Sequence, residues 1–208
     1  MENRLYATYC GIIRDTPDNI FSLCCPTREE EWIDGWNDRT YKLLCSESGF
    51  NEKHCVFEEY SLKPFLFGKQ GPTTWITTSF EPERFSLEFM LVFGDTAVMN
   101  RRIRVEKLSE DSVSACYWAD VVSFLEDPPT GIKRIIFKAK LDVFSHNLGY
   151  LLKYYSEKGR MLTIPRPLKR VLLRSIEHSE EHLLSEDHSN LITKESIEAL
   201  VLRYSGLI

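Results

Sequence analysis

His146, Tyr150 and Tyr154 are spaced so that a helix would bring their side chains to one face. A histidine beside tyrosine hydroxyls can give and take protons near neutral pH, which is the chemistry of a general acid or base. No further side chain makes His146 part of a catalytic set, and a partly buried histidine that only packs is the favoured interpretation. His146 is therefore a weak catalytic candidate.

Arg101 stands in a row of alternate residues that is otherwise apolar. The other members of this row are Ala97, Met99, Ile103 and Val105. An arginine that points inward could hold a ligand carboxylate or phosphate through two hydrogen bonds. It could equally pair with Asp120 on a neighbouring strand, or a β-bulge could turn it outward. The spacing leaves these three readings open.

His178, Glu181 and His182 match the H-x-x-E-H spacing of inverzincin metalloproteases. The motif lies in a very polar stretch and lacks a downstream glutamate signature, so a solvated helix is favoured and no metal site is predicted. No Ser-His-Asp set, phosphate-binding loop or dinucleotide fingerprint occurs, and no cofactor is predicted.

These side chains need a long helix and a sheet to position them. The stretch Thr130–Gly159 contains no proline and predicts one long helix with Gly159 at its end. It carries two apolar stripes. One comprises Ile132, Ile136, Ala139, Val143, Tyr150 and Tyr154, with His146 and Asn147 on its flanks; the other comprises Phe137, Leu141, Phe144, Leu148, Leu152 and Tyr155. We expect a sheet to cover the first stripe and the C-terminal tail, or a second copy in a homodimer, to cover the other.

The residues before this helix predict an antiparallel sheet. A strand over Leu5–Arg14 is followed by two short helices, over Pro17–Leu23 and Thr27–Trp32. Six more strands are expected, over Tyr41–Ser46, His54–Ser61, Thr73–Phe80, Arg84–Phe93, Thr96–Leu108 and Ser112–Leu125, with a loop after Pro64. Short connections favour a meander that curls around the long helix.

Composition limits the class of protein. The 208 residues are 43% hydrophobic and 12% aromatic, which suits one globular domain with an extension. A net charge of −5 argues against nucleic-acid binding. No apolar run reaches the length of a membrane span, no signal peptide is visible, and the six cysteines form no CxxC pair. We therefore expect a cytoplasmic protein.

Three blocks resemble the bacterial SRPBCC superfamily of START-like, birch-pollen-allergen-like and polyketide-cyclase-like proteins. They are CPTREEEWIDGW (Cys25–Trp36), SESGFNEKHCVF (Ser46–Phe57) and TTWITTSFEPE (Thr73–Glu83). The end of the long helix, LLKYYSEKGRML (Leu151–Leu162), is similar to the last helix of the same group. The segment Glu126–Gly131 departs from the pattern, and the tail after Leu162 lies outside it.

The resemblance implies an α+β helix-grip fold over residues 1–162, in which a curved seven-stranded antiparallel sheet wraps around a long C-terminal helix. Residues 163–208 would form a helical extension packed on that helix or at a dimer interface. A cavity between sheet and helix would bind a small hydrophobic or amphipathic molecule. The expected ligand-binding residues are Trp32, Trp36, Trp75, Phe85, Leu87, Phe89, Leu91, Phe93, Arg101, Val143, His146, Asn147, Tyr150 and Tyr154.

Two other functions stay open at this point. A cyclase- or hydrolase-like enzyme could use the same cavity, with His146 and the tyrosines transferring protons. A protein–protein docking module, like chaperone-activating relatives of the fold, would have a filled core instead of a cavity.

Overall fold

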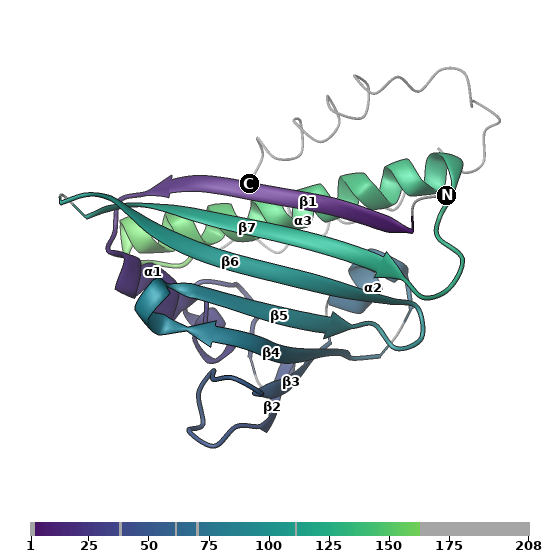
Figure 1. Cartoon of the computed structure of the whole chain (residues 1–208), viewed down its shortest axis with the longest axis horizontal. Coiled ribbons are helices and arrows are strands. Elements are labelled where there is room, and N and C mark those ends of the chain that lie inside the picture. Colours follow the sequence, from purple (N-terminus) through teal and green to yellow (C-terminus); the bar gives the residue numbers. More distant parts are fainter. Residues whose placement is uncertain (1–2, 38, 61, 70, 111, 163–208) are drawn as a thin grey trace.

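The computed structural model describes residues 3–37, 39–60, 62–69, 71–110 and 112–162. They form one antiparallel sheet with strand order β1-β7-β6-β5-β4-β3-β2, beside which a long helix runs (Figure 1). The strands are β1 (Arg4–Ile13), β2 (Tyr41–Cys45), β3 (Val56–Glu59), β4 (Thr73–Glu81), β5 (Ser86–Val92), β6 (Ala97–Ser109) and β7 (Val113–Phe124). The predicted helix-grip architecture of a curved sheet and a long helix is confirmed.

Within the described residues, five helical segments accompany the sheet. They are α1 (Pro17–Leu23), the 3-10 turn η1 (Pro26–Glu31), α2 (Leu62–Phe67), the 3-10 turn η2 (Pro82–Arg84) and α3 (Gly131–Lys158). The Thr16 side chain accepts a hydrogen bond from the Asn19 amide, which caps α1 as predicted. Gly159 ends α3 in the left-handed conformation, with φ of 63°. The helix α2 was wrongly predicted as a loop, because Pro64 was taken as the end of a strand.

Strand pairing follows the chain except at the first strand. Strands β2 to β7 are consecutive neighbours, whereas β1 pairs with β7, and the Asn3 side chain donates to the Phe124 carbonyl 121 residues away. On β6 the buried residues Ala97, Met99, Arg101, Ile103 and Val105 alternate with more exposed ones. The only register shift between β6 and β7 lies at Lys107–Ser109, so no bulge turns Arg101 outward.

The stripe of α3 that packs inward differs from the predicted one. Its buried residues are Phe137, Leu141, Ser145, Gly149 and Leu152. Phe137, Leu141 and Leu152 belong to the stripe that was expected to meet the tail. Ser145 and Gly149 are small residues that belong to neither predicted stripe. Phe137 packs its ring against Phe67 of α2 and Phe124 of β7, at centroid distances of 5.1 and 5.2 Å. The expectation that the sheet covers the other stripe was wrong.

Gly149 explains how closely α3 approaches β1. The Tyr9 ring of β1 lies against this glycine, and a Cβ added at Gly149 would stand 2.3 Å from Tyr9 Cε1. Tyr9 also covers Gly11 on its own strand, where an added Cβ would meet its hydroxyl at 2.0 Å. Two glycines therefore make room for one aromatic ring between strand and helix.

Within the described residues, no helix combines the length and the apolar character that crossing a membrane requires. The predicted extension over residues 163–208, its packing on α3 and the H-x-x-E-H motif lie outside the residues that the structure describes.

Candidate functional site

A buried ion pair lies on the inner face of the sheet. Arg101 of β6 and Asp120 of β7 stand opposite each other, and the arginine donates from Nε to Oδ1 at 2.8 Å and from Nη2 to Oδ2 at 2.9 Å. Their side chains are 2% and 0% exposed. The Ser145 hydroxyl of α3 donates to Asp120 Oδ2, which ties the pair to the helix. Of the three readings open for Arg101, pairing with Asp120 is confirmed.

Aromatic rings enclose the Arg101 guanidinium. Its Cζ lies 4.8 Å from the ring centre of Phe144, 5.0 Å from that of Trp118 and 5.7 Å from that of Trp75. These rings come from α3, β7 and β4. The charge is thus held between sheet and helix by its carboxylate partner and by cation–π contacts.

Several buried polar atoms have no hydrogen-bond partner within the described part of the chain. Four of them belong to strand residues: the Tyr41 hydroxyl, the Thr73 hydroxyl, Trp75 Nε1 and Trp118 Nε1. Thr77 on β4 differs, because its hydroxyl donates to Asn51 Oδ1 at 2.6 Å. Since a buried polar atom without a partner costs free energy, this group of atoms calls for an explanation.

Glu29 brings a carboxyl group to the same region from η1. Burial raises the pKa of this carboxyl to about 8, although the residue as a whole keeps partial exposure. The positive charge of Arg101 opposes this rise in pKa, and Glu59 adds to it. Burial also raises the pKa of the Tyr41 hydroxyl, with smaller contributions from Cys55, Cys25 and Glu29. The Glu29 carboxyl therefore interacts electrostatically with Arg101 of β6, Glu59 of β3 and Tyr41 of β2.

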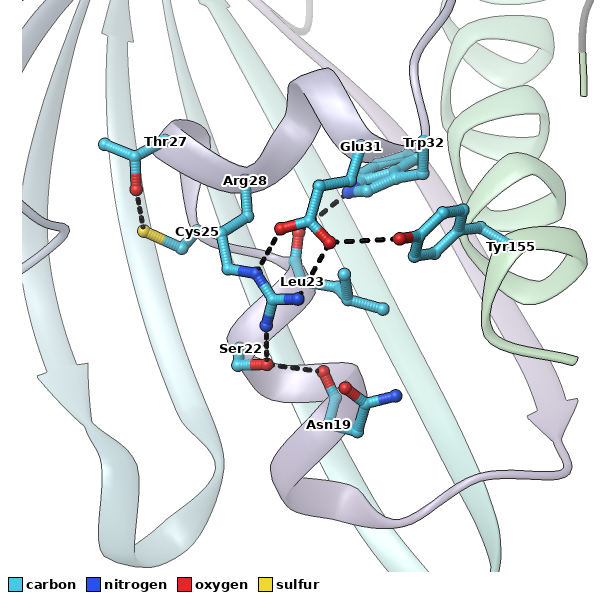
Figure 2. Close-up of polar contacts among 9 residues, drawn as sticks. All are labelled: Asn19, Ser22, Leu23, Cys25, Thr27, Arg28, Glu31, Trp32 and Tyr155. Atoms are coloured by element: carbon cyan, nitrogen blue, oxygen red, sulfur yellow. Dashed lines mark hydrogen bonds and ion pairs between the residues drawn. The ribbon is translucent and has the colours of Figure 1, made fainter. Parts of the chain in front are cut away.

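The turn η1 that carries Glu29 is held on both sides (Figure 2). Arg28 forms two hydrogen bonds with Glu31, at 2.6 and 2.9 Å, and also donates to Ser22. The Tyr155 hydroxyl of α3 donates to Glu31 Oε2 at 3.0 Å. These contacts, with Arg28 as the largest cause, lower the pKa of Glu31. They fix η1 between α1 and the end of α3.

A pocket of about 280 Å³ opens between α2, the β6–β7 end of the sheet and the first turns of α3. Leu66, Phe67, Phe124, Ile136 and Phe137 supply its apolar lining. Its charged lining residues are Glu126, Asp127, Lys133 and Lys140. A pocket lined by both apolar and charged side chains suits an amphipathic molecule.

The predicted tryptophans occupy three different settings. Trp32 is buried and donates from Nε1 to the Leu23 carbonyl at 2.9 Å, which makes it a core residue. Trp36 donates to the Pro26 carbonyl at 3.2 Å and stacks on Tyr41. Trp75 lies in the interior beside Arg101.

Among the predicted wall residues of the sheet, Leu87, Phe89, Leu91 and Phe93 are buried. Phe85 precedes β5 in a left-handed conformation with φ of 48°, at the end of η2. Its ring packs on Phe21 of α1, and the residue packs against the buried core. The turn η2 interrupts the alternation, so β5 begins at Ser86 and not at Arg84 as predicted.

The predicted helix residues lie away from the Arg101 centre. His146 and Tyr150 are exposed, and Val143, Asn147 and Tyr154 are partly exposed. His146 Nδ1 contacts the Asp142 carbonyl at 2.9 Å, and its ring meets Tyr9 edge-on. Among the described residues, no hydrogen bond joins His146 to the interior polar groups.

Sequence reasoning missed Glu29, Tyr41, Thr73 and Ser145. Glu29 sits in a run of three glutamates that suits a helix start, so its sequence context gave no sign of burial. Ser145 follows Phe144 on α3. The two apolar stripes already accounted for the packing of this helix, so a buried serine was not expected there. Only the alternation of β4, which points Thr73 to the same side as Trp75, carried a usable signal.

Searches of protein families and of curated proteins gave no match to this chain. Among solved structures, the chain is similar to the ginseng major latex-like protein 151 from Panax ginseng, at a TM-score of 0.51 and 14% identity, covering 74% of this chain and 99% of that chain. A START superfamily protein from Mycobacterium smegmatis matches at 0.50 and 13%, covering 73% and 96%. The di-domain ARO/CYC BexL from the BE-7585A biosynthetic pathway matches at 0.50 and 13%, covering 72% and 45%.

These similarities establish the fold. The first two matched proteins are covered almost completely by this chain, so the helix-grip unit is present over its full length. At identities of 13–14%, these matches show that the chain shares the helix-grip fold.

Proposed function

We propose that this protein binds a small hydrophobic or amphipathic molecule between the inner face of the sheet and α3. The observation that carries the proposal is the group of buried polar atoms without partners on the strands facing α3. Trp75 and Trp118 are 4% and 3% exposed, and each buries an indole N–H that donates to no described atom. A core that served packing alone would favour apolar side chains there, since each such atom costs about 1–3 kcal/mol.

The surroundings of these atoms support the same reading. Aromatic rings and aliphatic side chains make up most of the inner face, with a few placed polar groups among them, which is the usual composition of a small-molecule site. The 280 Å³ pocket between α2 and α3 lies at one end of the sheet.

The alternative functions have less support. An enzyme that relies on His146 would need this residue near the interior, but His146 is exposed and contacts its own helix backbone. The docking module stays an alternative prediction. Homodimer formation and a cytoplasmic location stay predictions.

Native mass spectrometry of the purified protein, followed by extraction under denaturing conditions, tests the proposal. We expect the native mass to include a bound small molecule that is lost when the protein is denatured. Titration with the dye 8-anilinonaphthalene-1-sulfonate adds a second measurement, in which we expect saturable binding. The double variant R101M/D120L should change the dye affinity, whereas Arg102→Met on the outer face should not, because Arg102 pairs with Glu88 on the exposed side. A clean apo mass without saturable dye binding would overturn the proposal.

A further inference from the structure

We propose that the 280 Å³ pocket at the α2 end of the sheet binds a small aromatic carboxylate, with the ligand rings against phenylalanine side chains and the negative charge beside Lys133. This inference rests on the proposed function and deepens it, because it names the class of ligand and the residue that recognises its charged group.

Lys69 holds two walls of this pocket together. It follows α2, and its ammonium donates to Thr96 Oγ1 at 3.0 Å and to Glu126 Oε2 at 3.1 Å. Thr96 precedes β6 and Glu126 follows β7, so these bonds connect α2 to the end of the sheet beside the start of α3 (Figure 1). The ion pair also balances the negative charge of Glu126, which is one of the lining residues.

Phenylalanine rings from three elements line the pocket. Phe137 of α3 lies 5.1 Å from Phe67 of α2 and 5.2 Å from Phe124 of β7, measured between ring centres. These rings are inclined to one another by 51° and 68°. A flat aromatic ligand gains edge-to-face or offset-stacked contacts with such rings. The volume lies just below the range of about 300–1,000 Å³ that is usual for ligand pockets, which favours a ligand of one or two rings.

The wall formed by α3 brings positive charge to these rings. Lys133, Ile136, Phe137 and Lys140 line the pocket, and their spacing puts them on one face of the helix. Within the described part of the chain, the Lys133 ammonium has no hydrogen-bond or ion-pair partner. Lys133 also stands in the first turn of α3, where the helix macrodipole is positive and no acidic residue offsets it. Both features attract an anion.

Asp127 supplies the opposing charge. It is exposed in the loop between β7 and α3, and it lines the same pocket. Because Lys69 balances Glu126, the carboxylate of Asp127 alone opposes Lys133 and the positive end of α3 among the described lining residues. This balance favours a ligand with a single negative charge.

Arg101 is a weaker candidate for holding the ligand's negative charge. Asp120 already accepts two hydrogen bonds from its guanidinium, and the two side chains are 2% and 0% exposed. The exposed Lys133 can instead meet a carboxylate without breaking an existing ion pair.

Two probes of equal shape test the site. 2-Naphthoate carries a carboxylate at neutral pH, whereas 2-naphthamide carries a neutral amide in its place. We would measure both affinities by equilibrium dialysis with the full chain at low salt. The wild-type protein should bind naphthoate more tightly, and Lys133→Met should weaken naphthoate binding by about three- to tenfold, the effect of one charge-assisted hydrogen bond at a partly exposed site. Binding of naphthamide should change by less than about twofold.

Asp127→Asn should act in the opposite direction. The change removes the repulsion between Asp127 and the bound carboxylate, so naphthoate binding should tighten by about two- to fivefold while naphthamide binding stays constant. Raising NaCl from about 0.05 M to about 0.5 M should weaken naphthoate binding and leave naphthamide binding unchanged, because salt screens the exposed charges.

Two further variants locate the probes. Ile136→Ala shortens an apolar lining side chain and should weaken both naphthalenes by about two- to fivefold. Lys158→Met is the matched control for Lys133→Met, because Lys158 is exposed in the last turn of α3, roughly 37 Å along the helix from Lys133. It should leave both affinities unchanged. Urea unfolding of each variant establishes that the dialysed protein is folded.

The outcomes separate the two proposals. If both naphthalenes bind but Lys133→Met and Asp127→Asn leave the ratio of their affinities unchanged, or if Ile136→Ala affects neither, the carboxylate site is overturned and the proposed function stands. The same holds if neither naphthalene binds to a protein whose native mass includes a small molecule. If neither binds and the protein is also apo without saturable dye binding, both proposals are overturned.

Discussion

The Ser145 hydroxyl of α3 and the Asp120 carboxylate of β7 share a hydrogen bond in the interior, at the point where Asp120 also holds Arg101. This contact links the long helix to the middle of the sheet through a charged group. Both side chains are buried, so neither can exchange its protein partner for water. The buried ion pair and the placement of α3 on the sheet therefore depend on the same three residues, Arg101, Asp120 and Ser145.

Asp120→Asn should destabilise the protein strongly. The change leaves the Arg101 charge buried without a compensating carboxylate, and breaking a buried pair in this way costs about 3–5 kcal/mol. Urea unfolding measures the effect. The double variant R101M/D120L removes both charges and should recover most of the loss. The exposed pair of Arg102 and Glu88 offers a control, because Glu88→Gln should cost no more than about 1 kcal/mol. If Asp120→Asn lowered the free energy of unfolding no more than Glu88→Gln does, this prediction would be contradicted.

Ser145→Ala should lower the free energy of unfolding by about 1.5–3 kcal/mol, the usual value for a hydrogen bond to a charged group. Ser156 on the same helix is the matched control. Its buried hydroxyl has no partner in the described residues, so Ser156→Ala should be neutral or slightly stabilising. Equal effects of the two substitutions, measured by thermal unfolding, would count against the Ser145–Asp120 contact.

Gly149→Ala should destabilise the protein, although a glycine-to-alanine change inside a helix normally adds about 1 kcal/mol of stability. The new methyl group would collide with the Tyr9 ring, which lies against Gly149. Overpacking of this kind costs about 1–3 kcal/mol. In a Tyr9→Ala background the obstacle is gone, and the same substitution should become stabilising. No change of sign between the two backgrounds would refute the explanation.

Stability should depend on pH through Glu29. In the unfolded chain this carboxyl ionises near its usual pKa of 4.5, whereas in the folded protein it stays protonated up to about pH 8. The folded state therefore binds more protons between these values, and stability falls as pH rises from 4.5 to 8. Below pH 4.5 the full stability is present.

Glu29→Gln should remove this part of the pH dependence. The difference in urea midpoint between variant and wild type should be small at pH 4 and should favour the variant increasingly towards pH 8. Other titrating groups act on both proteins and cancel in the difference. A difference that stays constant with pH would show that Glu29 ionises normally.

The fold could be predicted from the sequence because its signals are local. Alternation along β5 and β6, the Thr16–Pro17 helix start and the glycine after α3 each follow from the preferences of nearby residues. The orientation of α3 could not be predicted in this way. Two apolar stripes competed, and the choice between them depended on Gly149 and Ser145, whose small size matters only against Tyr9 and Asp120.

The candidate site was less accessible to sequence reasoning. Alternation pointed Arg101 inward and allowed Asp120 as its partner, but the burial that raises the pKa of Glu29 depends on where η1 lies in the fold. That position brings together residues far apart in the chain, and a single sequence holds no pattern for it. His146 was chosen for its chemistry, and its exposed position follows from the rotation of α3.

The pairing of β1 with β7 also bears on how the chain folds during synthesis. The first strand leaves the ribosome early, yet its partner lies about 110 residues further on. At about 5–20 residues per second, β1 waits on the order of 5–20 s before β7 can cover its edge. Contacts of such high sequence separation slow folding. The N-terminal strand is therefore the part of the sheet that depends longest on chaperones or on its own solubility.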